Sequence, residues 1–235
     1  MSLGIEIKTI NEVIKLFFVS GWWILFLSSV GAQLSPLLST SGFSQLQLRD
    51  GSSYVILTDR LVLTPGTLIG FSFRTCLPSG QLFRQIGQSN DLLSLSFSEA
   101  GGLRLSLESG EERRTLVAGA NLADGAWHTV RLGVSANQTA ICLGVDGPVE
   151  WECGSTPESA PSSVSRLEDA ASLLTSLQLA GASSQLRVGS GLVGCLSQGP
   201  QLRFSAANIA DSAAVDWSTC AFPESCTGQL IENVR

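Results

Sequence analysis

The sequence predicts an all-β protein, an antiparallel jelly-roll β-sandwich that follows a cleaved N-terminal signal peptide. Short runs of alternating apolar and polar residues recur along most of the 235-residue chain, separated by Gly, Pro or Asn-Asp turns. Long helical runs are missing from this pattern, which argues against a parallel α/β sheet. Apolar residues make up 44% of the chain and charged residues 14%, so one large core can be buried.

The first 32 residues differ from the rest. They contain the chain's only lysines, Lys8 and Lys15, followed by a charge-free apolar stretch over residues 16–30. A short run of small residues that ends at Ala32 follows this stretch, so we predict a secretory signal peptide that is cleaved after Ala32. An uncleaved anchor is the alternative, but this stretch is shorter than the roughly 20 residues a membrane span needs. Residues 33–41 are expected to form an irregular lead-in.

The expected strands follow in order. The clearest is Gly66–Thr75, in which Ile69, Phe71 and Phe73 share one face. Residues 93–97 alternate in the same way between leucine or phenylalanine and serine. The other strand-like runs before residue 120 are residues 45–48, 54–57, 82–86, 103–107 and 115–118.

Two more strands lie between Asp124 and Gly147. The Asp124-Gly125 turn precedes an alternating run over residues 127–134, and residues 139–145 form its partner. Residues 155–171, rich in Ser, Pro and Glu, are expected to form a surface loop. Residues 167–179 fit either a short helix or a strand flanked by loop. No internal repeat is visible, which favours one domain.

Two segments resemble the laminin G-like domain family. Residues 124–147 contain D-G-x-W-H-x-V and then L-x-V-D-G, and Gly194-Cys195 with Cys220 is similar to the family's closing element. The likeness covers residues 42–220 and leaves residues 221–235 as a tail or the start of a following module. It implies a concanavalin-like jelly roll that acts as a secreted or cell-surface binding or adhesion module, with an extracellular protein or glycan as partner.

A signal peptide that leads almost directly into such a domain also resembles the N-terminal region of transmembrane chondroitin sulfate proteoglycans. That likeness implies membrane attachment only as part of a longer anchored ectodomain. Two further functions remain open on the same architecture: a lectin or glycan-processing enzyme, and a carrier of a small apolar ligand. Fold alone does not separate them.

The six cysteines all follow Ala32, so disulfides are expected in an oxidising compartment. The family resemblance implies Cys195–Cys220. Cys142 and Cys153 flank the turn at Asp146-Gly147-Pro148 at matching distances, which favours their pairing. Cys76 and Cys226 remain by elimination, although Cys226 could belong to a following module and Cys76 could be free.

The resemblance also implies a calcium site at the rim of the sandwich. Asp124 matches the family's carboxylate, and Leu143 would supply a backbone carbonyl. After Gly194-Cys195 the expected Asp or Asn is missing, and Leu202 and Arg203 stand there instead. Ca²⁺ takes six to eight oxygen ligands and favours carboxylates. We therefore expect no cofactor, or at most weakly bound Ca²⁺.

Other candidate chemistry has simpler explanations. His128, the only histidine, is interpreted as a structural residue at a strand edge. Glu150 and Glu152 share one strand face as glycosidase carboxylates do, but no further carboxylate or aromatic cleft is evident, so we predict no enzyme activity.

Charge and composition limit the classes of binding partner. The net charge of −6 and the lack of lysine after Lys15 argue against nucleic acid, and Arg113-Arg114 beside two glutamates suits a solvated turn better than a heparin site. Asn137-Gln138-Thr139 is a glycosylation sequon between two strands, and its occupancy is expected in a secreted protein.

Overall fold

The computed structural model of the chain describes residues 5–9, 12–19, 22–26, 42–147, 153, 163–179, 184–222 and 226. The chain divides into two compact units, residues 1–40 and 41–235. In the first, β1 (Ile5–Thr9), β2 (Glu12–Val19) and β3 (Trp22–Phe26) form a three-stranded antiparallel sheet. The predicted cleavage site and lead-in lie outside the described residues, so export remains a prediction.

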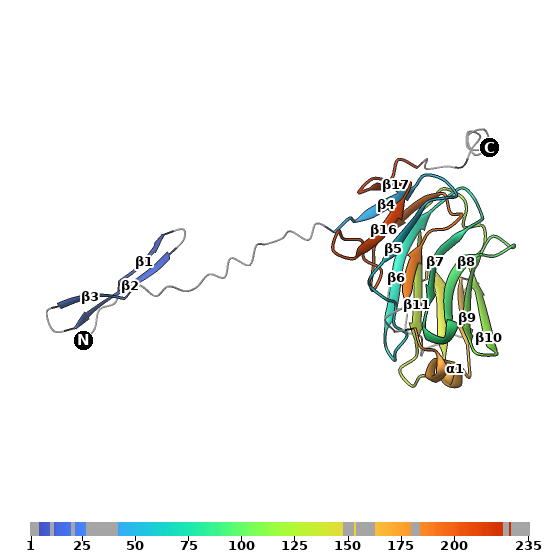
Figure 1. The fold of residues 1–235 in the computed structure, drawn as a ribbon, viewed down its shortest axis with the longest axis horizontal. Coiled ribbons are helices and arrows are strands. Elements are labelled where there is room, and N and C mark those ends of the chain that lie inside the picture. Colours follow the sequence, from blue (N-terminus) through green and yellow to red (C-terminus); the bar gives the residue numbers. More distant parts are fainter. Residues whose placement is uncertain are drawn as a thin grey trace. The chain divides into compact units, whose positions relative to one another are not determined.

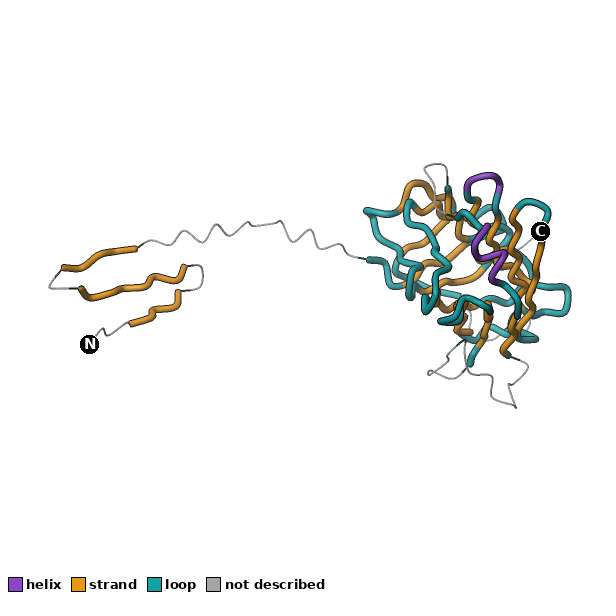
Figure 2. The backbone as a smooth tube through the Cα atoms, turned by 90° about the horizontal axis from the view of Figure 1, so that it is seen from below, coloured by secondary structure: helices purple, strands orange, loops and turns teal. Residues whose placement is uncertain are grey.

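The second unit consists of two seven-stranded antiparallel sheets, which confirms the predicted sandwich (Figure 1). The first sheet has the order β10-β9-β8-β7-β14-β5-β16, and the second has the order β13-β12-β11-β6-β15-β4-β17. Strands and loops make up almost all of this unit, as Figure 2 shows.

The first sheet contains β5 (Tyr54–Leu57), β7 (Gln81–Ile86), β8 (Leu92–Phe97), β9 (Leu103–Ser109), β10 (Glu112–Ala118), β14 (Gln185–Val188) and β16 (Ile209–Ala213). The second contains β4 (Gln45–Leu48), β6 (Leu68–Arg74), β11 (His128–Val134), β12 (Ile141–Val145), β13 (Val164–Leu167), β15 (Gly194–Ser197) and β17 (Val215–Trp217). The short helices are η1 (Gln88–Asn90) and α1 (Ala171–Ser176), and α1 lies at one end of the sandwich (Figure 1).

The core lies between the sheets because each strand alternates its side chains between an inner and an outer face. Phe71 on β6 packs edge-on against Phe83 on β7, with ring centroids 6.0 Å apart. Phe73 meets Phe97 on β8 in the same way at 5.7 Å. These aromatic contacts therefore join the two sheets. They involve residues from the alternating apolar positions of the sequence.

Two expectations need correction. Residues 155–171 were expected to form a loop, but Val164–Leu167 forms edge strand β13, paired with β12. Strands β14, β15, β16 and β17 were not foreseen either. All of these strands are short, so pairing with a neighbouring strand outweighs their weak local patterning. Of the two alternatives left open for residues 167–179, a short helix forms, over Ala171–Ser176.

Candidate functional site

Two turns meet at one rim of the second sheet, where β11 begins and β12 ends. The first contains Asp124 and Gly125, and the N–H of Gly125 donates to the carbonyl of Thr75 just after β6, at 3.0 Å. The second contains Asp146, whose N–H donates to the carbonyl of Thr129 at 2.8 Å. Asp146 has a φ of 54°, a left-handed conformation that aspartate tolerates better than most residues.

His128 joins these two turns. Its Nδ1 lies 2.7 Å from Oδ2 of Asp146, and its Nε2 lies 3.0 Å from Oδ1 of Asp124. The imidazole is only 10% exposed and packs against the ring of Phe73, with centroids 5.5 Å apart. Each ring nitrogen faces a carboxylate oxygen, which accepts but does not donate, so both hydrogen bonds form only when the ring is doubly protonated. The interpretation of His128 as a structural residue agrees with this arrangement.

The electrostatics follow from these contacts. Burial alone lowers the pKa of His128, but the hydrogen bonds and negative charges of Asp146 and Asp124 outweigh it, so the pKa is raised. The pKa of Asp124 is lowered, first by the hydrogen bond from the N–H of Ala126 and then by His128. His128 therefore lies between two carboxylates that favour its charged form.

The same rim exposes an aromatic side chain. Trp127, next to His128, is 39% exposed. Arg131 donates from Nη1 to the carbonyl of Gly147 at 2.7 Å and holds the second turn in place. On the first turn, Sγ of Cys226 lies 3.4 Å from the carbonyl oxygen of Ala123, so the Cys76–Cys226 disulfide borders the rim. The name rim turns is used below for residues 124–128 and 146–147.

The residues expected to bind calcium do not come together. Leu143 pairs with Leu132, which pairs in turn with Ile69 near the start of β6, whereas the turn of Asp124 lies beside Thr75, just after the end of β6. The chain after Cys195 runs to the far end of β6, where the N–H of Gly70 donates to the carbonyl of Pro200. Leu202 and Arg203 follow Pro200 in the chain and lie near that end of β6, whereas Asp124 lies at the other end.

Asp124 is also already engaged, because its Oδ1 accepts hydrogen bonds from Ala126 and His128. Within the described residues, no three His, Cys, Asp or Glu side chains gather in a way that could hold a metal ion. The donor set therefore does not fit the family's calcium ion.

Asn137 lies at the opposite end of β11 from the rim turns, about 20 Å away along the strand. The residue is exposed, and its Oδ1 accepts hydrogen bonds from the hydroxyls of Ser135 and Thr139, each at 2.8 Å. These bonds use the amide oxygen of Asn137 and not its nitrogen, which is the glycan attachment atom. Glycosylation remains a prediction, and this geometry suits it.

The structure contains three disulfides, Cys195–Cys220, Cys142–Cys153 and Cys76–Cys226, which are the pairings expected from the sequence. The Cys195–Cys220 and Cys76–Cys226 bridges pin the C-terminal segment to the sheet, and Phe222 is buried beside Cys195.

The remaining candidates are the pair Arg113 and Arg114 and the two glutamates Glu150 and Glu152. Arg113 and Arg114 pair with Glu108 and Glu112 at 3.0 and 3.2 Å on an exposed hairpin, as a solvated mixed-charge turn would. Glu150 and Glu152 lie outside the described residues. No described helix is long and apolar enough to cross a membrane.

These features define a class of protein: a disulfide-bonded antiparallel jelly roll that presents polar and aromatic groups on turns at one end. Residues 73–198, more than half of the chain, match the laminin G domain family, and the chain belongs to that family. Laminin G domains are extracellular binding modules and in general not enzymes. Among curated proteins, no match was found.

Two solved structures are similar in fold. One is the LG1-3 region of the laminin α2 chain, with a TM-score of 0.56, 17% identity and coverage of 75% of this chain. The other is domains LG4-5 of the mouse laminin α1 chain, with a TM-score of 0.52, 18% identity and 74% coverage. This chain spans only 34% and 46% of those two multidomain chains, so the comparison concerns one domain of each.

Proposed function

We propose that this chain is a secreted or cell-surface adhesion module that recognises an extracellular matrix or cell-surface protein or glycan through its rim turns. The observation that carries the proposal is the exposed ring of Trp127, next in the chain to the buried His128, which joins two half-exposed carboxylates. Exposed tryptophan supplies a large apolar contact area with a polar edge, and such residues are enriched where proteins bind partners.

Rigidity supports this assignment. A binding surface gains affinity when its groups are already ordered, because less conformational entropy is lost on association. The rim turns are tied to each other through His128 and to β6 through the Gly125–Thr75 hydrogen bond. Turns on a rigid sandwich are also the usual place for binding residues.

The position of the predicted glycosylation site also supports the rim turns as the contact surface. A glycan on Asn137 would cover the turn that joins β11 to β12, about 20 Å from the rim turns. The rim turns would then remain accessible in the glycosylated protein. Because His128 already bridges the two rim carboxylates, partner binding should not require Ca²⁺.

The test compares matched alanine variants of the secreted protein. Trp127→Ala should weaken binding to intact extracellular matrix at least tenfold, whereas Val117→Ala should leave it unchanged. Val117 is the matched control because it is similarly exposed, at 45%, on β10 of the other sheet. Both variants should keep the thermal stability of the parent. Equal binding by all three proteins would show that the rim turns are not the contact surface.

The class of partner needs a second measurement. Binding that survives removal of matrix glycans points to a protein partner. Binding to defined sugars on a glycan array, lost in Trp127→Ala, points to a lectin. Chelation of divalent cations should change neither result.

A further inference from the structure

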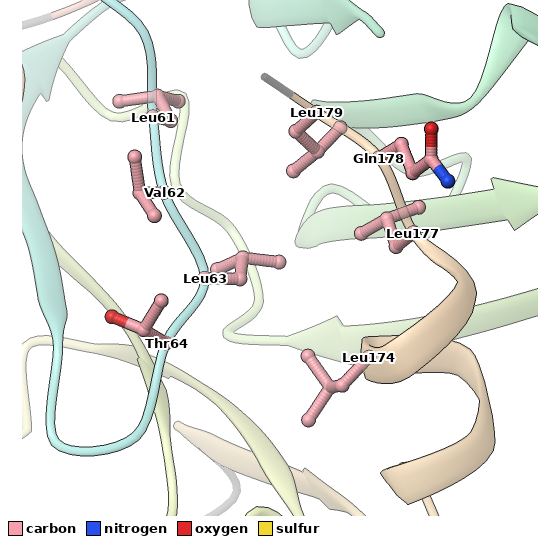
Figure 3. Close-up of a pocket in the computed structure, with 8 residues that line it drawn as sticks. All are labelled: Leu61, Val62, Leu63, Thr64, Leu174, Leu177, Gln178 and Leu179. Carbon is pink, nitrogen blue, oxygen red and sulfur yellow. The ribbon is translucent and has the colours of Figure 1, made fainter. Parts of the chain in front are cut away.

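A cavity of about 360 Å³ lies between two segments at the end of the sandwich away from the rim turns (Figure 3). One wall is the extended stretch 61–64 that precedes β6, and the other is the stretch 174–179 at the end of α1. Both walls attach near the β11–β12 connection, since Gly66 donates to Val134 and Ala170 donates to Thr139. The lining residues are Leu61, Val62, Leu63, Thr64, Leu174, Leu177, Gln178 and Leu179.

Six of the eight lining residues carry aliphatic side chains. Figure 3 shows the side chains of Leu63, Leu174 and Leu177 directed into the gap, with the hydroxyl of Thr64 and the amide of Gln178 directed away from it. These three leucines are only partly buried, although they pack against the core. A molecule in the cavity would therefore meet hydrocarbon on both sides.

A buried amide holds the two walls apart at a fixed spacing. Gln85 on β7 is fully buried, and its Oε1 accepts from the N–H of Leu61 at 2.7 Å. Its Nε2 donates to the carbonyls of Leu61 and Leu179, each at 3.0 Å. The amide thus bridges one wall to the other, and both of its N–H groups are used. The spacing of the two walls is therefore set by hydrogen bonds within the fold.

The second wall is fixed independently. The N–H of Gln178 donates to Oδ2 of Asp91 at 2.6 Å, and the N–H of Gln88 donates to the carbonyl of Gln178 at 3.0 Å. A Cβ added at Gly87 would lie 2.0 Å from that carbonyl oxygen, so this wall lies as close to the backbone of Gly87 as a glycine allows. The leucines of the two walls consequently face each other across a preformed space.

We infer that this cavity binds a small molecule with an aliphatic hydrocarbon body, either an acyl chain or a saturated ring system, whose polar group remains in solvent at the mouth. The volume corresponds to about twelve water molecules at ~30 Å³ each and lies at the lower end of the range for small-molecule sites. A sugar or nucleotide would lose its hydration without regaining hydrogen bonds from these side chains.

The site is separate from the rim turns, so this inference stands or falls without the adhesion proposal. Calorimetric titration of the purified protein with dodecanoate and with adamantane-1-carboxylate tests it, with galactose as a polar control. At least one of the two aliphatic probes should bind and galactose should not. The tighter probe identifies a chain or a ring as the preferred hydrocarbon.

Variants that fill the cavity locate the binding. Leu177→Trp and Leu63→Trp enlarge partly exposed side chains on opposite walls, so at least one should fold normally. Each folded variant should bind the aliphatic probe at least tenfold more weakly, whereas Val117→Trp on the exposed face of β10 should bind it as the parent does. Absence of binding by the parent, or unchanged binding by a folded cavity-filling variant, would overturn the inference.

Discussion

Replacing His128 by phenylalanine should destabilise the domain more at low pH than at high pH. The substitution keeps a ring against Phe73 but removes both hydrogen bonds to the carboxylates. A hydrogen bond to a charged group contributes about 1.5–3 kcal/mol when buried. The side chains of Asp124 and Asp146 are 53% and 47% exposed, so water replaces part of each bond and the contribution falls toward that of a surface pair.

We therefore expect a combined loss of about 2 kcal/mol at pH 5.5, where His128 is doubly protonated. For a domain of this size that corresponds to a melting temperature lower by about 4–8 °C. Because folding raises the pKa of His128, its contribution is fully present below the ordinary value near 6.5 and is lost as pH rises through the folded-state pKa. Raising the pH to 8.5 favours the neutral ring, which donates only one hydrogen bond, so the expected loss is smaller by up to about half.

Urea denaturation of the parent and His128→Phe at the two pH values measures this difference. Val130→Ala is the matched control, because it removes a buried apolar group from the same strand without touching a titratable residue. Its loss of stability should be the same at both pH values. A His128→Phe effect that does not change with pH would refute the doubly protonated arrangement.

Four further predictions follow from the sequence and the fold. N-terminal sequencing of the secreted protein should begin at or within a few residues of Gln33, and a mature form that retains Trp22 would contradict the signal peptide. Cys195→Ser should remove about 3 kcal/mol of stability, from a loop with a sequence separation of 25, and should sharply lower secretion. Asn137→Gln should abolish the mobility shift that glycosidase treatment produces in the parent, and an unshifted parent would show an empty sequon. Isothermal titration should find Ca²⁺ binding no tighter than about millimolar, whereas a micromolar constant that is lost in Asp124→Ala would show a metal site at this rim.

Much of the fold could be predicted from local patterns. The inner residues Phe71 and Phe73 appear in the sequence as every second residue, and the structure places them in the core. Period-2 alternation reports which face of a strand is buried, whatever its neighbour is. The Asp124-Gly125 and Asp146-Gly147 turns could be located in the same way, because turn residues act through their own backbone conformation.

Edge elements could not be predicted in this way. Strand β13 has four half-buried residues, and Ile209–Ala213 in β16 is mostly exposed, so neither shows a buried face in its sequence. They are strands because the backbones of β12 and β5 offer them unpaired groups at the edges of the sheets. That pairing depends on where distant segments lie.

The sequence by itself determined the all-β class, the family and the residues of the turns at Asp124 and Asp146. Only the tertiary structure decided which residues these turns contact. The strand register places the two carboxylates on either side of His128, and β15 carries Leu202 and Arg203 to the far end of β6. Gln85 likewise bridges Leu61 and Leu179, which are 24 and 94 residues away in the chain. Contacts across such separations depend on the packing of the two sheets, which local periodicity does not encode.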